Sequence, residues 1–233
     1  MNLFYQPAIQ QGVHHLDPTE SKHCTKVLRK KNGDKIIITD GKGFLYEALI
    51  TVADPGECRF EIQEKKAEPV RSFTIHIAIS STKHPDRFEW FVEKAVELGV
   101  DRITVITCEH TEHSHLKTER LEKIAISAMK QSLRLTLPKI DGPIDFNTVV
   151  NQTEAGSKYI AHVDSNNAEH LKTIAKRDSD VLVLIGPEGD FSLQEIEVAV
   201  NKGFRKVSLG SNRLRTETAG LAACHILNLV NTA

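Results

Sequence analysis

Two loops in the C-terminal half of the chain carry residue types that can bind a ligand or assist a reaction. The first covers residues 185–192, IGPEGDFS, and directly follows an unbroken apolar run. Its glycines permit close approach of the backbone to a ligand, and Pro187 holds its own φ fixed. The loop can therefore present rigid N–H and C=O groups to the edge of an adenine ring. A plain turn between a strand and a helix explains the same residues equally well.

The second loop covers residues 209–219, LGSNRLRTETA, and leads into the last apolar segment. Thr216 and Thr218 are suitable helix caps, and capping alone explains both threonines. Capping does not explain Arg215. Its guanidinium can hold a phosphate, or stabilise a uracil oxygen while negative charge develops there. Arg215 is therefore a candidate for charge stabilisation.

Other ligand chemistries find less support in the sequence. No Gly-Lys-Ser/Thr follows residues 185–192, as a phosphate loop requires, and the chain has no G-x-G-x-x-G fingerprint. Cys108, His110, His113 and His115 are close in sequence, but their spacing is irregular and no second cluster accompanies them. Because four-ligand zinc sites show tighter paired spacing, we expect no bound metal.

Alternating strands and helices over residues 72–233 must position the two loops. The order predicts an α/β domain with a mostly parallel sheet covered by helices on both faces. Both loops then lie at the carboxyl ends of strands, where open parallel sheets bind ligands. Trp90, Phe88 and Phe91 are expected in the core. Strands are predicted over 73–79, 103–107, 159–163, 181–185 and 207–209, and helices over 85–98, around 121–128, around 171–174, from 192 and after 215.

Residues 1–70 form a separate, strand-rich part of the chain. Strands are expected over 35–39, 44–52 and 58–63, with a glycine-containing turn between the first two, and a short helix over 19–28. Short strands joined by such turns predict a compact β-barrel. The charged, proline-containing stretch 65–71 is the expected linker to the second part.

The charge of the chain is nearly balanced, with 30 basic and 31 acidic residues and a formal net charge of −1. Nucleic-acid binding must therefore rest on a local patch. One stretch of the first domain is strongly basic, with Asp34 as its only acid, although a solvated helix face is a common reason for such a stretch. Its basic residues are Lys22, Lys26, Arg29, Lys30, Lys31 and Lys35.

The pattern of cysteines and apolar residues indicates in which cellular compartment the protein is expected. The four cysteines show no paired spacing, so we expect neither a disulfide framework nor a zinc knuckle. The N-terminal stretch lacks the pattern of a signal peptide, and no apolar run approaches membrane-spanning length. We therefore expect a reduced, soluble and cytoplasmic protein.

Several segments, in order along nearly the whole chain, resemble the RsmE family of 16S ribosomal RNA methyltransferases. Residues 184–192 and 203–223 resemble its cofactor-binding signature, residues 23–43 its PUA-like N-terminal domain, and residues 83–100 and 123–138 two catalytic-domain helices. The chain departs from the family at Asp190, where a second glycine is common, and in the number of histidines over residues 108–115. Gly189 is expected to keep the flexible backbone position of the loop.

The resemblance implies a SPOUT methyltransferase domain over residues 72–233, with a C-terminal trefoil knot made by the two loops, preceded by a PUA-like RNA-binding β-barrel over residues 1–70. It also implies a homodimer and S-adenosylmethionine held largely by backbone groups. The implied cofactor-binding residues are Ile185, Gly186, Pro187, Glu188, Gly189, Leu209, Gly210, Leu214, Arg215, Thr216, Glu217, Thr218 and Ala219.

The implied reaction is methylation of N3 of a specific uridine in 16S ribosomal RNA, within the small ribosomal subunit. Arg215 is expected to stabilise the uracil anion, and Glu217 to orient Arg215 or to assist removal of the proton. Two alternatives stay open: a ribose 2′-O-methyltransferase of a sibling knotted family, and a non-catalytic RNA-binding module. The expected RNA-binding residues are Lys22, Lys26, Arg29, Lys30, Lys83 and Arg87.

Overall fold

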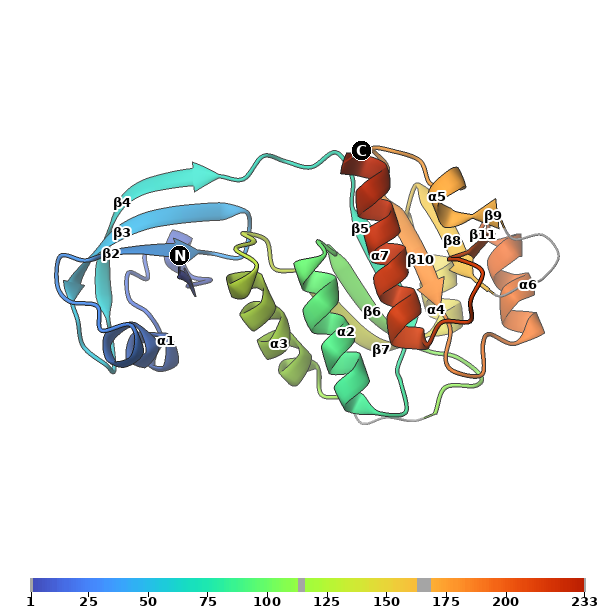
Figure 1. Cartoon of the computed structure of the whole chain (residues 1–233), viewed down its shortest axis with the longest axis horizontal. Coiled ribbons are helices and arrows are strands. Elements are labelled where there is room, and N and C mark those ends of the chain that lie inside the picture. Colours follow the sequence, from blue (N-terminus) through green and yellow to red (C-terminus); the bar gives the residue numbers. More distant parts are fainter. Residues whose placement is uncertain (1, 113–115, 163–168, 233) are drawn as a thin grey trace. The chain divides into compact units, whose positions relative to one another are not determined.

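A computed structural model describes residues 2–112, 116–162 and 169–232 (Figure 1). The chain packs as two compact units, Met1–Val70 with Ile126–Leu137, and Arg71–Ala125 with Pro138–Ala233. The segment Ile126–Leu137 thus packs in the first unit although it follows much of the second along the chain. The division into domains at residues 1–70 and 72–233 stays a prediction.

The first unit is built on a four-stranded sheet in the order β1-β2-β3-β4. β1 pairs with β2 in parallel, and the other pairs are antiparallel. Alternate residues of the central strands, such as Ile36 and Ile38, are buried in one apolar cluster, which is the signature of a sheet with one covered face. The strands are β1 (Leu3–Tyr5), β2 (Lys35–Thr39), β3 (Phe44–Val52) and β4 (Arg59–Ala67).

The helix expected over residues 19–28 is present in two pieces. Asp17 caps it, because its Oδ1 accepts from the backbone N–H groups of Thr19 and Glu20 at 2.7 and 2.9 Å. β4 extends to Ala67, so the expected linker over residues 65–71 is wrong in its first three residues, which are paired with β3. The helical pieces of this unit are η1 (Ile9–Gln11), α1 (Pro18–Lys22) and the π-helical turn η2 (His23–Val27).

The segment after α3 (Thr118–Gln131) is held by the turn between β2 and β3, within the first unit. The carbonyl oxygen of Leu135 accepts from Gly43 N and from Thr39 Oγ1, both at 3.0 Å. Leu137 N donates to Gly41 O at 2.8 Å. Residues 135–137 thus form hydrogen bonds with the turn between β2 and β3 and with the end of β2.

The second unit is built on a seven-stranded sheet in the order β7-β6-β5-β10-β8-β11-β9. Every pairing in it is parallel, which confirms the expected α/β architecture. β7, β9 and α4 were not expected from the sequence. The remaining elements are β5 (Ile75–Ser80), α2 (Pro85–Glu97), β6 (Arg102–Thr107), β7 (Lys139–Asp145), α4 (Phe146–Gln152), β8 (Ser157–Ala161), β9 (Glu169–His170), α5 (Leu171–Ile174), β10 (Val181–Ile185), α6 (Leu193–Asn201), β11 (Arg205–Ser208) and α7 (Thr216–Thr232).

Helices cover both faces of this sheet (Figure 1). On one face Leu182 and Leu184 of β10 join an apolar cluster with side chains of α4 and α6. On the other face α7 packs beside α2, and a Cβ added to Gly220 would lie 2.6 Å from the Phe91 ring and 2.8 Å from Ile79. Because β10 is covered on both sides, all five of its residues are buried.

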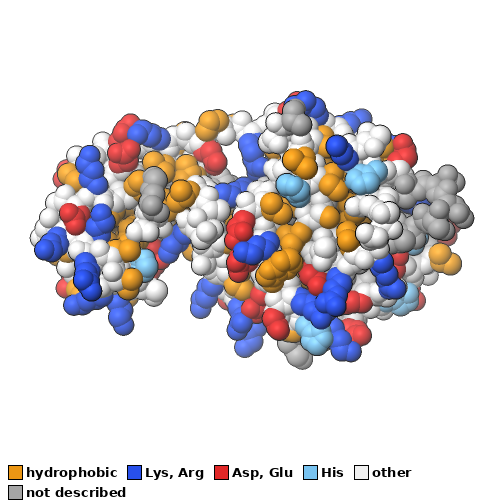
Figure 2. Space-filling view, viewed as in Figure 1, with side chains coloured by type: hydrophobic (Ala, Val, Ile, Leu, Met, Phe, Trp, Pro, Cys, Tyr) orange, Lys and Arg blue, Asp and Glu red, His pale blue; other side chains and the backbone are white. Residues whose placement is uncertain are grey.

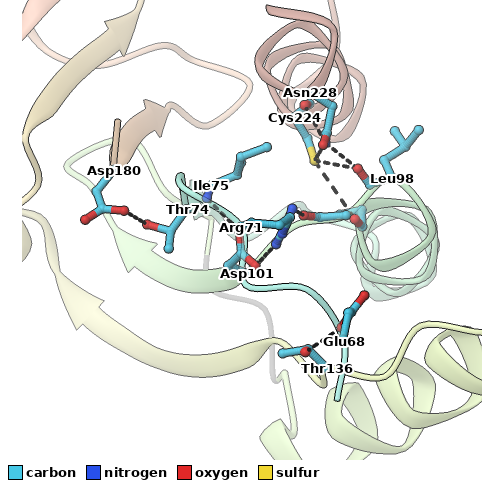
Figure 3. Close-up of polar contacts among 12 residues, drawn as sticks. Glu68, Arg71, Thr74, Ile75, Leu98, Asp101, Thr136, Asp180, Cys224 and Asn228 are labelled. Atoms are coloured by element: carbon cyan, nitrogen blue, oxygen red, sulfur yellow. Dashed lines mark hydrogen bonds and ion pairs between the residues drawn. The ribbon is translucent and has the colours of Figure 1, made fainter. Parts of the chain in front are cut away.

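Polar contacts secure the start of the second unit and the packing of α7 (Figure 3). Arg71 pairs with Asp101, whose Oδ2 also accepts from Ile75 N at 2.7 Å. At the end of α2, the carbonyl oxygen of Leu98 accepts from Asn228 of α7. These bonds fix the edge of the sheet opposite to its carboxyl ends.

One prediction about the core is wrong. Phe88 and Phe91 are fully buried, as expected, but Trp90 is 46% exposed. Residues advance by about 100° along a helix, so Trp90 lies about 200° from Phe88 and faces away from the buried side of α2.

Candidate ligand-binding site

A cavity of about 830 Å³ opens at the carboxyl ends of β8, β10 and β11, beside the first turn of α7. This is the edge at which parallel sheets bind ligands. Both loops identified from the sequence line it, together with the two residues Ala161 and His162 at the end of β8. Its lining residues are Ala161, His162, Ile185, Gly186, Pro187, Glu188, Asp190, Val207, Ser208, Leu209, Gly210, Ser211, Asn212, Arg213, Leu214, Arg215, Thr216 and Ala219.

The loop after β10 makes a tight turn, in which Asp190 N donates to Pro187 O at 2.9 Å. The residue in the left-handed conformation is Asp190, with φ 63°. Asp is tolerated there better than most residues, because its short side chain can bond to the local backbone. The expectation that Gly189 keeps the flexible position of the loop stays a prediction. Gly186 has little free space beside it, since a Cβ would lie 3.1 Å from the Phe191 ring.

The carboxylate of Asp190 is bonded on both oxygens. Oδ1 accepts from Phe191 N at 2.8 Å, and Oδ2 lies 2.8 Å from Nδ1 of His162. The backbone oxygen of Asp190 lies 3.1 Å from Nδ1 of His110. Three separate segments of the chain therefore hold this residue in place.

Two hydrogen bonds tie the loop after β10 to the loop before α7. Thr216 Oγ1 donates to Gly186 O at 3.1 Å, and Arg213 donates through its guanidinium to Glu188 O at 3.3 Å. The first helical bond of α7 runs from Ala219 N to Arg215 O at 2.8 Å. Thr216 thus joins the two loops, a contact that neither its expected capping role nor its expected place at the cofactor predicts.

Most of the residues proposed for a cofactor line this cavity. The exceptions are Gly189, Glu217 and Thr218. Arg215 lines the cavity and is exposed, but Glu217 is only 7% exposed and does not line it. The members that line it are Ile185, Gly186, Pro187, Glu188, Leu209, Gly210, Leu214, Arg215, Thr216 and Ala219.

Sequence reasoning missed part of the lining. His162 and Ala161 lie at the carboxyl end of β8, and the strand-end rule used for the other two loops would have found them. Ser211, Asn212 and Arg213 lie inside the second loop, but no residue pattern singled them out.

The residues predicted to contact RNA are mostly at the surface. In the first unit Lys22, Lys26 and Arg29 are exposed, and Figure 2 shows Lys and Arg side chains around α1. Lys30 is half-buried, and its Nζ donates to Lys35 O at 3.1 Å. In the second unit Lys83 is exposed and lies 3.2 Å from Glu112, while Arg87 is half-buried.

His113 and His115 of the histidine-rich segment lie outside the described residues. Burial raises the pKa of Cys108 to about 12, which disfavours the thiolate form that metals bind. Among the residues that the structure describes, no group of three His, Cys, Asp or Glu side chains is arranged to hold a metal. Within the same ranges, no helix has the length and apolar character needed to cross a membrane.

Two family models match the chain. An RNA methyltransferase domain matches residues 69–228, and an RNA methyltransferase PUA domain matches residues 16–63. A curated relative, the ribosomal RNA small subunit methyltransferase E of Aquifex aeolicus, is 29% identical over 231 residues, which cover 97% of this chain and 99% of the relative.

Solved structures agree with these matches. A probable rRNA-methyltransferase from Porphyromonas gingivalis is 44% identical, with a TM-score of 0.92, over 98% of this chain and 99% of its own. A ribosomal RNA small subunit methyltransferase E from Neisseria gonorrhoeae, bound to S-adenosyl methionine, is 31% identical, with a TM-score of 0.85, over 99% of this chain and 98% of its own.

Proposed function

Because the chain belongs to the RNA methyltransferase family that includes the small subunit methyltransferases E, we propose that it methylates N3 of a uridine in 16S ribosomal RNA with S-adenosylmethionine as the methyl donor. The observation that carries the proposal is the cavity at the carboxyl ends of β8, β10 and β11. Its walls contain most of the residues expected from the family signature, and Thr216 joins its two main loops.

The residues around the cavity fit S-adenosylmethionine. Residues 185–188 of the loop after β10 line the cavity, so its backbone groups are available to a ligand there. Leu209, Leu214 and Ala219 supply apolar surface, and Glu188 supplies negative charge near a cationic ligand. When bound, the sulfonium supplies an activated methyl group.

The protein's own contribution is position and charge. Arg215, exposed in the cavity wall at the start of α7, is placed to stabilise the negative charge of a uracil that has lost its N3 proton. Glu217 does not line the cavity, so we assign it a supporting place in the first turn of α7, where the helix dipole favours an acidic side chain.

The strand order supports a trefoil knot as part of the same proposal. β10 lies between β5 and β8, and the chain then continues to β11 on the far side of β8. The loops before and after this crossing form the cavity. Knots are very rare in proteins, so this topology is a specific expectation of the SPOUT class.

The first unit is proposed to bind RNA as a PUA-like barrel. The match of the RNA methyltransferase PUA domain and the exposed Lys22, Lys26 and Arg29 support this role. Lys30 of the first unit, and Lys83 and Arg87 of the second, are proposed to add phosphate contacts. We further propose a homodimer, a small ribosomal subunit as substrate, and action in the cytoplasm.

One experiment tests the proposed reaction. The purified protein is incubated with methyl-labelled S-adenosylmethionine and small ribosomal subunits that lack the modification, and the labelled nucleoside is identified by mass spectrometry. We expect 3-methyluridine and at least a hundredfold lower turnover for Arg215→Ala. A 2′-O-methylated nucleoside would favour the sibling activity, and absence of cofactor binding would favour a non-catalytic RNA-binding module.

A further inference from the structure

His162 lies in the cavity wall directly after β8, and its side chain is 19% exposed. Its Nδ1 lies 2.8 Å from Oδ2 of Asp190. A carboxylate only accepts hydrogen bonds, so the proton of a neutral imidazole must be on Nδ1. Nε2 then carries a lone pair and is an acceptor.

Asp190 can hold His162 in this tautomer because several contacts fix the position of Asp190 itself. Its Oδ1 accepts from Phe191 N at 2.8 Å, its backbone N donates to Pro187 O, and its backbone oxygen contacts His110. The pair therefore joins the carboxyl end of β8 to the loop after β10. A carboxylate that fixes the tautomer of a histidine is a common device where the other ring nitrogen has a ligand to bind.

The arginines and the glutamate in the cavity wall cannot offer a neutral nitrogen acceptor like Nε2 of His162. Arg213 and Arg215 only donate hydrogen bonds. Glu188 carries a full charge, and its Oε1 already accepts from Lys83 N at 3.2 Å. In its neutral form His162 is thus a ring acceptor in a wall that otherwise presents charges, hydroxyl and amide groups, apolar side chains and backbone.

We propose that Nε2 of His162 accepts a hydrogen bond from the bound S-adenosylmethionine, from its adenine amino group or a ribose hydroxyl, and that Asp190 is a positioning residue that fixes the tautomer. The inference rests on the proposed function of the cavity. It gives a role to Asp190, the residue that departs from the family's usual glycine.

Two substitutions separate this role from a structural one. In His162→Asn, the amide nitrogen can still donate to Asp190, but no atom occupies the position of Nε2. In Asp190→Asn, the amide oxygen must face Phe191 N, so the amide NH₂ faces His162 and forces the proton onto Nε2. Asn also tolerates the left-handed backbone of residue 190, so this variant keeps the shape of the loop.

Calorimetry with S-adenosylmethionine at pH 8 measures the outcome. We expect both variants to bind about 3- to 10-fold more weakly than the wild type, as for the loss of one hydrogen bond, with unchanged circular dichroism. His162→Gln, whose side-chain oxygen reaches close to the position of Nε2, should recover part of the affinity. If His162→Asn binds as tightly as the wild type, the inference is wrong.

The same titrations separate failure of this inference from failure of the proposed function. A wild type that binds no S-adenosylmethionine would overturn the proposed function itself, whereas a wild type that binds it no more tightly than His162→Asn would overturn only the inference.

Discussion

The hydroxyl of Thr216, the first residue of α7, donates to the carbonyl oxygen of Gly186, the first residue after β10, at 3.1 Å. The two residues are 30 positions apart in the sequence. Because Thr216 is 4% exposed, water cannot easily replace this bond. Of the two hydrogen bonds that join the main loops of the cavity, this one is therefore the better protected from water.

Replacing Thr216 with valine keeps the volume of the side chain and removes this bond. We expect S-adenosylmethionine affinity to fall about 3- to 10-fold, because the carbonyl of Gly186 loses its partner and the two loops separate more easily. Thr218→Val is the matched control, since Thr218 is exposed and does not line the cavity. Calorimetry on both variants checks the prediction, and equal affinities would show that the loops are held by other contacts.

His76 of β5 makes the stability of the second unit depend on pH. Burial, with a contribution from Arg102, lowers its pKa from 6.5 to about 4, and its Nε2 lies 2.8 Å from Thr104 Oγ1. The unfolded chain therefore binds the proton first as pH falls. The stability contributed by neutral His76 is complete above pH 6.5 and is lost between pH 6.5 and 4, by up to roughly 3 kcal/mol.

His76→Gln tests this expectation, because glutamine does not titrate but can still bond to Thr104. Urea unfolding of the wild type should show stability falling over this pH window, and the variant should show a smaller fall. A parallel fall in the two proteins would assign the pH dependence to other groups.

Gly41, in the turn between β2 and β3, is needed for both its backbone conformation and its lack of a side chain. Its φ is 72°, and a Cβ would lie 2.9 Å from the Tyr5 ring and 3.3 Å from Leu137. Gly33 has a similar φ of 85°, but a Cβ there would meet nothing within 4 Å. Gly33→Ala should lower the free energy of unfolding by about 1–2 kcal/mol because of the backbone conformation alone. Gly41→Ala should lower it by about 1–3 kcal/mol more, because its Cβ is also crowded. Urea unfolding of the two variants gives the difference, and equal losses would mean that Tyr5 moves aside freely.

Elements with one strong pattern were predicted well from the sequence. β10 is an unbroken apolar run, and the structure gives the bounds that the run predicts. α6 begins where the capping box of Ser192 and Glu195 places it. In both cases the local preference of the residues and their burial in the fold agree.

Elements without such a pattern were missed. β7 contains Gly142 and Pro143, which indicate a turn, yet it pairs with β6 at the edge of the sheet, where a proline is tolerated. The left-handed φ of Asp190 and the contact of its carboxylate with His162 were not predicted from the sequence. His162 lies 28 positions from Asp190, so no local pattern could reveal this contact.

The basic patch of the first unit should control RNA binding without affecting the cofactor. Lys22, Lys26 and Arg29 are exposed, and their simultaneous change to glutamate replaces three positive charges by three negative ones. We expect affinity for a 16S ribosomal RNA fragment to fall at least tenfold. The negative slope of log K against log salt should become less steep by about 2, as for the loss of three single-strand phosphate contacts. A filter-binding titration at several salt concentrations measures both quantities.

Charge reversal of Lys176, Arg177 and Lys202 is the control for this prediction, because all three are exposed in the second unit and none lines the cavity. It makes the same change in net charge at a different place. If both triple variants lose RNA affinity equally, the protein attracts RNA by its total charge and not by the patch. If only the first variant loses it while both bind S-adenosylmethionine normally, the patch on the first unit holds the RNA backbone, and the cavity of the second unit acts on the base independently of that contact.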